Sequence, residues 1–444
     1  MINQMSLLRR VIATGRGSGL RAELIRGAMG IGGLKVLALP VGLAVSILLA
    51  RTLGPEGYGQ YAFIMSVVTI ISLPINQGMR QLMTREVASY HHGAEWGLLR
   101  GLLRRSHQWV LFLSLIVAVV LGTVAVFNAS WEVSDRWTLL LIGLIIPPFL
   151  GLNALRGGAL RGFGNVVLSQ LPELLVNPAL HLTIALSLFA FGLLNPATTI
   201  MSQALAAVFA LMLGTYFLYR KLPRQLHDTA LEYQSGKWIR AWIPFTLLMA
   251  ASQFNNQIGI LLLGWLGTDE QIAALRVADR GAKLVIFSLG VVNLVIAPHI
   301  TRAYRDANRH RLQQLSRQSA RAALAIAIPL ALPMIFFGGP IIDLVVGSEY
   351  VALSVAPLAI LASAQLVNVA FGSVGMFLVM SGFERDTLFG QLVALACNAL
   401  AAIILIPRFG AEGAAYAAAI GLLTWNFILA VKFVQRLKLR PSIF

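Results

Sequence analysis

Apolar residues fill long stretches of the chain, and short basic or Gly/Pro-containing segments separate these stretches. Most stretches contain about 17 to 25 residues, the length that an α-helix needs to cross a bilayer. The pattern predicts twelve membrane-spanning helices, over residues 27–50, 58–83, 109–127, 137–154, 166–191, 198–219, 241–266, 278–300, 320–337, 354–380, 387–406 and 411–433. Because Pro329 and Pro333 interrupt the ninth stretch, we expect that helix to be kinked or longer than its predicted bounds.

The composition supports an all-α integral membrane protein. Of the 444 residues, 57% are hydrophobic and only 12% are charged, and the mean hydropathy is +0.76. A soluble chain could not hydrate so much apolar surface. The single cysteine, Cys397, excludes an intrachain disulfide and a thiolate metal cluster, and we expect neither a metal nor a cofactor.

The net charge of +17 is distributed unevenly across the predicted membrane. Most of the 35 Lys and Arg residues lie before the first span, after the even-numbered spans and in the C-terminal tail, whereas the opposite side carries Arg51, Arg136, Arg276, Arg280, Lys283 and Arg408. This asymmetry follows the positive-inside rule and predicts that both termini are cytoplasmic. The basic balance therefore indicates topology and contact with anionic lipids, not nucleic-acid binding.

Short matches between the two halves of the chain indicate an internal repeat. Leu160-Arg161-Gly162-Phe163 precedes the fifth span and Met380-Ser381-Gly382-Phe383 precedes the eleventh, while Leu53-Gly54 and Leu266-Gly267 follow the first and seventh. Two six-span halves that start on the same side form a parallel repeat, as in many transporters. The predicted segments are a basic N-terminus over 1–26, a first half over 27–219, a linker over 220–240, a second half over 241–433 and a basic tail over 434–444.

Three motifs in the first half carry a resemblance to a known family. They are Leu49-Ala50-Arg51-Thr52-Leu53-Gly54-Pro55-Glu56-Gly57-Tyr58-Gly59-Gln60-Tyr61, Thr84-Arg85-Glu86-Val87-Ala88, and Leu155-Arg156-Gly157 through Arg161-Gly162-Phe163-Gly164. With these motifs the chain resembles the polysaccharide and oligosaccharide-lipid flippases of the MOP exporter superfamily, which also contains MATE drug exporters and lipid II flippases. The second half departs from the pattern, because its Leu266-Gly267-Thr268-Asp269 loop lacks the tyrosines.

The resemblance implies two six-helix lobes, related by a pseudo-two-fold axis, around a cavity that alternately faces each side of a bacterial cytoplasmic (inner) membrane. It also implies a lipid-linked oligosaccharide as substrate, contact with membrane lipids, and a polysaccharide polymerase with chain-length machinery as partners.

The same motifs have simpler structural explanations. Pro55 fixes φ and Gly57 tolerates positive φ, so a tight outer turn is expected there, and Tyr58 and Tyr61 suit a water–lipid interface. Arg156 and Arg161 could meet a phosphate at the cytoplasmic mouth, although the positive-inside rule explains them equally well.

Polar residues within the spans indicate function more strongly than polar residues in the loops, because a charge at the bilayer centre costs at least about 2.5 kcal/mol. Lys35 lies deep in the first span, and Asn76 and Arg80 share one face of the second. In the fifth span Glu173 begins a stripe with Asn177 and His181. Glu173 is either a proton or cation site or a structural partner of Lys35 or Arg80.

The second half contains two further polar groups. Gln253, Asn256 and Gln257 of the seventh span either bind sugar hydroxyls or join helices. In the eighth span Asp279 and Lys283 are spaced to pair, which leaves Arg280 the freer cation. We treat Lys35, Asn76, Arg80, Gln253, Asn256, Gln257, Arg280 and Lys283 as candidate substrate-binding residues, and Glu173 and Asp279 as candidates for ion or proton coupling.

This set is net cationic and therefore favours an anionic substrate over the organic cations of drug exporters. The leading hypothesis is a flippase that moves polyprenyl-pyrophosphate-linked oligosaccharide outward for O-antigen, capsule or exopolysaccharide synthesis. Alternatives are a lipid II-type or MATE-type exporter and, less favoured, an integral-membrane polysaccharide polymerase. No paired acids, P-loop or nucleophile–base arrangement in the sequence indicates an enzyme.

Overall fold

The computed structural model describes residues 20–129 and 135–439, and almost all of them are helical. The first half contains α2 (Leu20–Ile71), η1 (Pro74–Gly78), α3 (Met79–His92), α4 (Trp96–Ala129), α5 (Asp135–Gly143), α6 (Ile146–Gly162), α7 (Val166–Leu171), η2 (Pro172–Val176), α8 (Asn177–Ala190) and α9 (Pro196–Lys221). After α10 (Gln225–Asp228) follow α11 (Ser235–Leu266), α12 (Asp269–Arg305), α13 (Arg309–Phe336), α14 (Gly338–Val345), η3 (Ser348–Tyr350), α15 (Val351–Phe371), α16 (Val374–Met380) and α17 (Glu384–Leu437). No strand forms within these described ranges.

Each of the twelve predicted spans corresponds to a helix or a group of consecutive helices. Eight helices of the described chain are long and apolar enough to cross a membrane, or nine if the two bent parts of α12 count as one span. Two of the eight contain two spans each, because α2 is broken at Gly54 and α17 at Gly410, where the backbone leaves the helical conformation. The amide-rich α11 matches the remaining predicted span.

Breaks inside the spans depart from the predicted bounds. The tenth span is not one helix over 354–380, because Gly372, with φ 76° and ψ −160°, separates α15 from α16. The fourth is divided between α5 and α6. The ninth helix is longer than its predicted bounds, which confirms that expectation, and α14 follows it as a separate apolar helix. The basic N-terminal segment lies largely outside the described residues.

The turn after the first span also differs from the expectation. Gly54 adopts the positive φ of 69°, whereas Gly57 lies inside the following helix. The expectation for Tyr58 is wrong as well. Its ring is buried rather than interfacial, and its hydroxyl lies 2.6 Å from Ser46 Oγ. A buried hydroxyl needs such a partner, and Ser46 provides it from the preceding helix.

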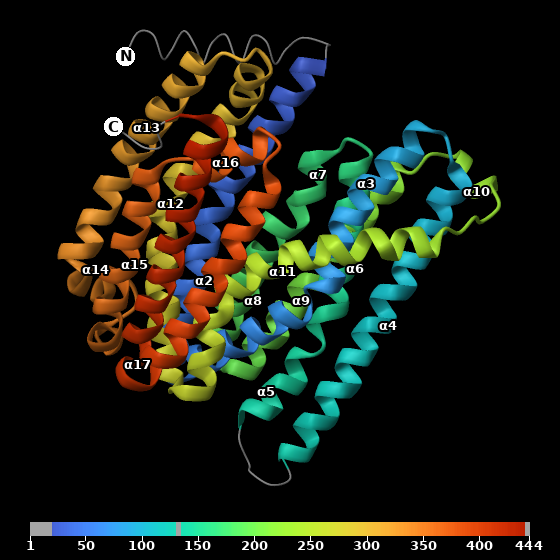
Figure 1. Cartoon of the computed structure of the whole chain (residues 1–444). Coiled ribbons are helices and arrows are strands. Elements are labelled where there is room, and N and C mark those ends of the chain that lie inside the picture. The colour runs from blue at the N-terminus through green and yellow to red at the C-terminus, as the bar shows by residue number, and fades with distance from the viewer. Residues whose placement is uncertain (1–19, 130–134, 440–444) are drawn as a thin grey trace.

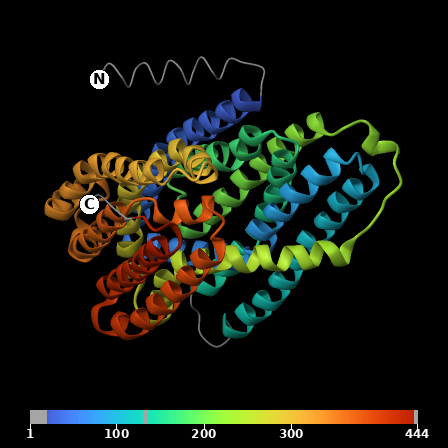
Figure 2. The same cartoon turned by 45° about the horizontal axis from the view of Figure 1, so that its top comes forward.

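Figure 1 shows α3 to α6 on one side of the molecule and α13 to α17 on the other, and Figure 2 shows the same separation from another direction. Helix α2 packs along α12, and α11 packs on α17 but also reaches α2, η1 and α3. The largest core cluster consequently combines Leu49 and Tyr58 of the first half with Ile260, Ala278 and Tyr350 of the second. The beginning of α2 and the end of α17 lie at the same end of the molecule (Figure 1).

Candidate functional site

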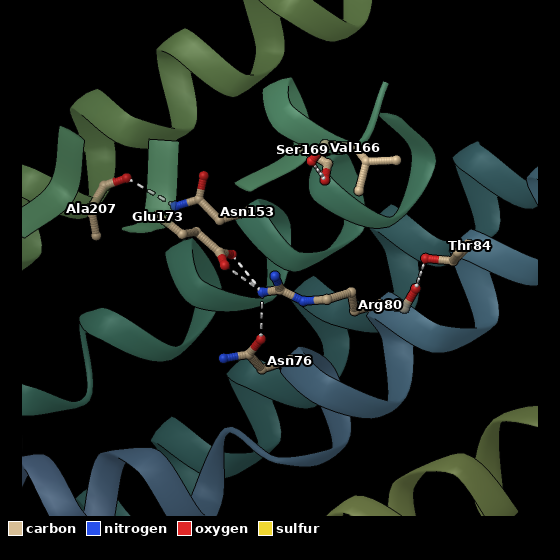
Figure 3. Close-up of polar contacts among 8 residues, drawn as sticks. All are labelled: Asn76, Arg80, Thr84, Asn153, Val166, Ser169, Glu173 and Ala207. Carbon is tan, nitrogen blue, oxygen red and sulfur yellow. Dashed lines mark hydrogen bonds and ion pairs between the residues drawn. The ribbon is translucent and has the colours of Figure 1, made fainter. Parts of the chain in front are cut away.

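A polar cluster inside the first half centres on Arg80. Its Nη2 atom donates hydrogen bonds to both carboxylate oxygens of Glu173, each at 2.6 Å, and to Asn76 Oδ1 at 3.2 Å. The Arg80 side chain is only 12% exposed, and that of Glu173 is 23% exposed. Figure 3 shows the guanidinium group between the two partners. Of the sequence-based alternatives for Glu173, the structure contains the pairing with Arg80, whereas the coupling role stays a prediction.

Two π-helical turns position this cluster. Asn76 lies in η1, immediately before the helix that carries Arg80, and Glu173 lies in η2. Both turns begin with a proline, Pro74 and Pro172, which has no N–H to donate to the preceding turn. A π turn inserts one residue and rotates the side chains that follow it, and such turns recur at functional sites. The extra residue in each turn therefore affects which side chains point toward α6, on which η1, α3 and α7 pack.

Glycines let α6 approach this cluster closely. A Cβ atom at Gly158 would lie 2.7 Å from the backbone oxygen of Arg80, and one at Gly157 would lie 2.9 Å from the backbone oxygen of Ser169. Only glycine permits this separation between α6 and its neighbours. At the end of α6, Arg161 lies within electrostatic reach of both Arg80 and Glu173. The cluster thus contains two guanidinium groups and one carboxylate.

A second polar group lies on α12. Lys283 Nζ is 2.5 Å from Asp279 Oδ2, which confirms the predicted i, i+4 pair. Lys283 remains half exposed. Arg280 forms no ion pair among the described residues, and its Nε atom is buried without a hydrogen-bond partner there. Arg280 also lies within electrostatic reach of Tyr61 on α2, across the contact between the two halves.

The amides of α11 form the third group. Gln257 accepts a hydrogen bond from Ser66 Oγ of α2 at 3.1 Å, so this side chain joins helices of the two halves. Asn256 Nδ2 lies 3.4 Å from Gln253 Oε1 on the same helix, and Asn256 is exposed. The helix-joining alternative therefore holds for Gln257, whereas Gln253 and Asn256 keep surface that a ligand could contact.

The structure does not join all the candidates into one network. Lys35 is exposed on α2 and forms no ion pair with a described residue. No hydrogen bond or ion pair between described residues links the Arg80 cluster to the α12 or α11 groups. Within the described ranges, no group of three or more His, Cys, Asp or Glu side chains is arranged to hold a metal ion.

Sequence reasoning missed the contacts that close one end of the molecule, which we call the Gly54 end because the break after the first span lies there. Arg136 of α5 pairs with Asp269 of α12 at 2.8 Å and also donates to the Gly264 carbonyl at 2.9 Å. Arg51 of α2 donates to the Val345 carbonyl at the end of α14, at 2.8 Å. The distribution of positive charge places Arg51 and Arg136 on the outer side, but it does not predict which residues they bind.

Aromatic residues connect the halves at a second place. Trp238, at the start of α11, is fully buried and donates from Nε1 to the Tyr90 hydroxyl of α3 at 2.9 Å. Trp242 donates to the Pro74 carbonyl at 2.9 Å and stacks on Trp109 with ring centroids 5.9 Å apart. The first turns of α11 are therefore fixed to the first half, directly beside η1.

Comparison with solved structures establishes the class of fold. The chain has the fold of the MOP superfamily transporters. It is similar to an inward-facing multidrug resistance MATE family transporter, with a TM-score of 0.74, 16% identity, and coverage of 92% of this chain and 98% of that one. It is also similar to the lipid II flippase MurJ in an inward closed conformation, with a TM-score of 0.72, 13% identity, and coverage of 90% and 86%.

Sequence comparison identifies the family. Residues 24–304 match the family described as "Polysaccharide biosynthesis protein", and the chain belongs to that family. An uncharacterized membrane protein of Methanocaldococcus jannaschii is 21% identical over 412 residues, which cover 88% of this chain and 80% of the relative. The predicted resemblance and the twelve-helix fold are thus confirmed, and the protein is a multi-pass membrane protein.

Proposed function

We propose that this protein moves a polyprenyl-pyrophosphate-linked oligosaccharide from the cytoplasmic to the outer leaflet of a bacterial inner membrane by alternating access. The glycan would serve surface polysaccharide synthesis, as O-antigen, capsule or exopolysaccharide. In this proposal both termini are cytoplasmic, the Gly54 end is external, and a polymerase with its chain-length partner receives the product.

The observation that carries this proposal is the largely buried Arg80 between η1 and η2. A guanidinium group presents several N–H donors in a planar arrangement that fits phosphate oxygens. Its position on a span, rather than in a loop, is costly in a membrane and needs a functional reason. Arg280 and Lys283 add positive charge on α12. Exposed amides such as Asn256 are suited to sugar hydroxyls.

Membrane potential supports movement in this direction. Moving an anionic head group outward from an inside-negative compartment releases roughly 2.3 kcal/mol per charge per 100 mV. An additional coupling ion at Glu173 or Asp279 is therefore compatible with the proposal, although the energetics do not require one.

Reconstitution tests the proposal. Proteoliposomes would carry a fluorescent polyprenyl-pyrophosphate oligosaccharide, and a membrane-impermeant quencher would report how fast the labelled head group crosses. We expect the wild-type protein to accelerate crossing and Arg80→Ala to reduce the rate by at least about tenfold, because about 1.4 kcal/mol of lost phosphate binding gives that factor. Arg309→Ala, which removes an exposed arginine at the start of α13, should leave the rate unchanged. Unaltered crossing by Arg80→Ala would overturn the proposed site, and transport of organic cations instead would favour a MATE-type exporter.

A further inference from the structure

The Arg80 cluster contains fewer anions than its arginines can bind. Among the described residues, Glu173 is the one carboxylate paired with Arg80, and Arg161 lies within electrostatic reach of the same carboxylate without forming an ion pair there. The Nε atoms of both arginines are buried and have no hydrogen-bond partner among the described residues. Buried donors of this kind normally have partners, so the cluster has unused capacity for acceptor oxygens.

The geometry of the ion pair is also unusual for a purely structural contact. Both Glu173 oxygens are 2.6 Å from the single Nη2 atom of Arg80. A carboxylate that uses an arginine fully would bind two nitrogens side by side. Arg80 therefore leaves its Nε atom without an acceptor among the described residues, while a single nitrogen contacts both Asn76 and Glu173 (Figure 3).

The two members of the pair differ in their freedom to move. Arg80 is held by Asn76 and by the close contact of its backbone with Gly158, whereas Glu173 has about twice the exposed fraction, 23% against 12%. Glu173 also lies in the π turn η2, where the regular helical hydrogen bonds are interrupted. The carboxylate is consequently the partner that can leave while the guanidinium stays in place.

From these observations we propose that Glu173 is the resident anion of the substrate site, and that the pyrophosphate of the substrate displaces it and binds between Arg80 and Arg161. The inference rests on the proposed function and assigns the roles within it. In the empty transporter Glu173 neutralises Arg80, because an unpaired buried cation is costly. In the loaded transporter the pyrophosphate, which has more oxygens than a carboxylate, occupies both arginines. When the product leaves, Glu173 pairs with Arg80 again and permits the return step.

Removal of the competing anion tests this exchange. Glu173→Gln preserves the size of the side chain but removes its charge. Purified protein in detergent would be titrated with geranylgeranyl pyrophosphate and binding followed by tryptophan fluorescence. We expect Glu173→Gln to bind the probe about tenfold more tightly, which corresponds to about 1.4 kcal/mol, and to flip substrate more slowly because release and reset are impaired. Arg161→Gln should weaken binding about tenfold in the wild-type and Glu173→Gln backgrounds alike.

Controls separate this exchange from general charge effects. Asp343→Asn removes an exposed carboxylate on α14 and should leave the affinity unchanged. Geranylgeraniol lacks phosphate, so Glu173→Gln should not increase the affinity for it. A titration with inorganic pyrophosphate shows whether the lipid is needed for binding. If Glu173→Gln does not fold, Glu173→Asp provides the same test, because the shorter side chain retracts from Arg80 and should give a smaller gain in affinity.

The possible results distinguish the two proposals. Tighter binding by Glu173→Gln, together with weaker binding by Arg161→Gln in both backgrounds, supports the exchange. If the wild type binds the probe and the Glu173 variant binds it equally or more weakly, the exchange is overturned. The proposed substrate then still stands. Absence of geranylgeranyl pyrophosphate binding in the wild type and in Glu173→Gln overturns the proposed function itself.

Discussion

Arg136 and Asp269 form an ion pair between the two halves of the chain, with Nη2 2.8 Å from Oδ1. Asp269 occupies the first turn of α12, where the N-terminal end of the helix favours a negative charge. Arg136 also lies over the Phe63 ring, with its Cζ atom 5.7 Å from the ring centroid. A Cβ atom at Gly59 would overlap the Asp269 carbonyl, at 1.9 Å, so the halves meet tightly here.

Loss of this pair should favour opening of the Gly54 end. Arg136 is 30% exposed, so solvent weakens the interaction, and we expect Arg136→Ala to shift the equilibrium by about 1 kcal/mol, or about fivefold in the open population. The measurement uses Ala50→Cys in a Cys397→Ser background, because Ala50 is buried at this end in the present conformation. An external, membrane-impermeant maleimide should label this cysteine about fivefold faster in the Arg136→Ala variant, because the closed state is destabilised by about 1 kcal/mol.

The matched variant for this measurement is Asp269→Asn, which removes the partner charge. It should produce a similar increase, and the double variant should add little because the two residues act through one contact. Additive effects, or unchanged labelling in either single variant, would show that the pair does not hold the halves together.

The Arg80–Glu173 pair also makes a prediction about stability. Arg80→Ala leaves a largely buried carboxylate without a partner, and we expect a loss of about 3 kcal/mol in the free energy of unfolding. Arg80→Ala combined with Glu173→Gln should recover part of this loss, since no buried charge then remains. Thermal unfolding in detergent gives the comparison. Equal stability of the single and double variants would indicate that Glu173 is hydrated or paired elsewhere when Arg80 is absent.

The close contact between α3 and α6 should be sensitive to a single methyl group. Gly158→Ala places a Cβ atom 2.7 Å from both the Arg80 carbonyl and Met83 Cβ, so α3 must move. Overpacking of this kind costs about 1–3 kcal/mol, and here it also displaces the guanidinium group. Gly42→Ala is the matched control, because a Cβ atom there meets nothing within 4 Å. We expect Gly158→Ala alone to lower the melting temperature and weaken binding of geranylgeranyl pyrophosphate.

The fold could be predicted from sequence to the extent that hydropathy determines it. The length of each apolar stretch fixes where a helix can cross the membrane, so all twelve spans were found. A helix break inside an apolar stretch does not change the hydropathy of the sequence. Hydropathy therefore does not predict that α15 ends at Gly372. Gly54 was recognised as part of a turn, but the positive φ was assigned to Gly57, which has the same local sequence signals.

The site was predictable only where its contacts are local. The spacing of Asp279 and Lys283 on one helix predicted their ion pair, because residues four apart share a face. Arg80 and Glu173 are 93 positions apart, and sequence left both Lys35 and Arg80 as partners of the acid. Only the packing of α3 and α7 on α6 decides between them. The same holds for Arg136 and Asp269, whose helices approach each other only in the assembled fold.

The orientation of the protein in the membrane is the last prediction, and it determines the direction of transport. Basic residues concentrate at the end opposite to the Gly54 end, so the positive-inside rule places the linker between the halves in the cytoplasm. In a Cys397→Ser background, Ser348→Cys should react with an impermeant maleimide in intact spheroplasts, because Ser348 is exposed and lies close in sequence to Val345 at the Gly54 end. Gln234→Cys, exposed just before α11, should react only after permeabilisation. The opposite pattern would place Arg80 and Arg161 nearer the external face and reverse the proposed movement of the lipid.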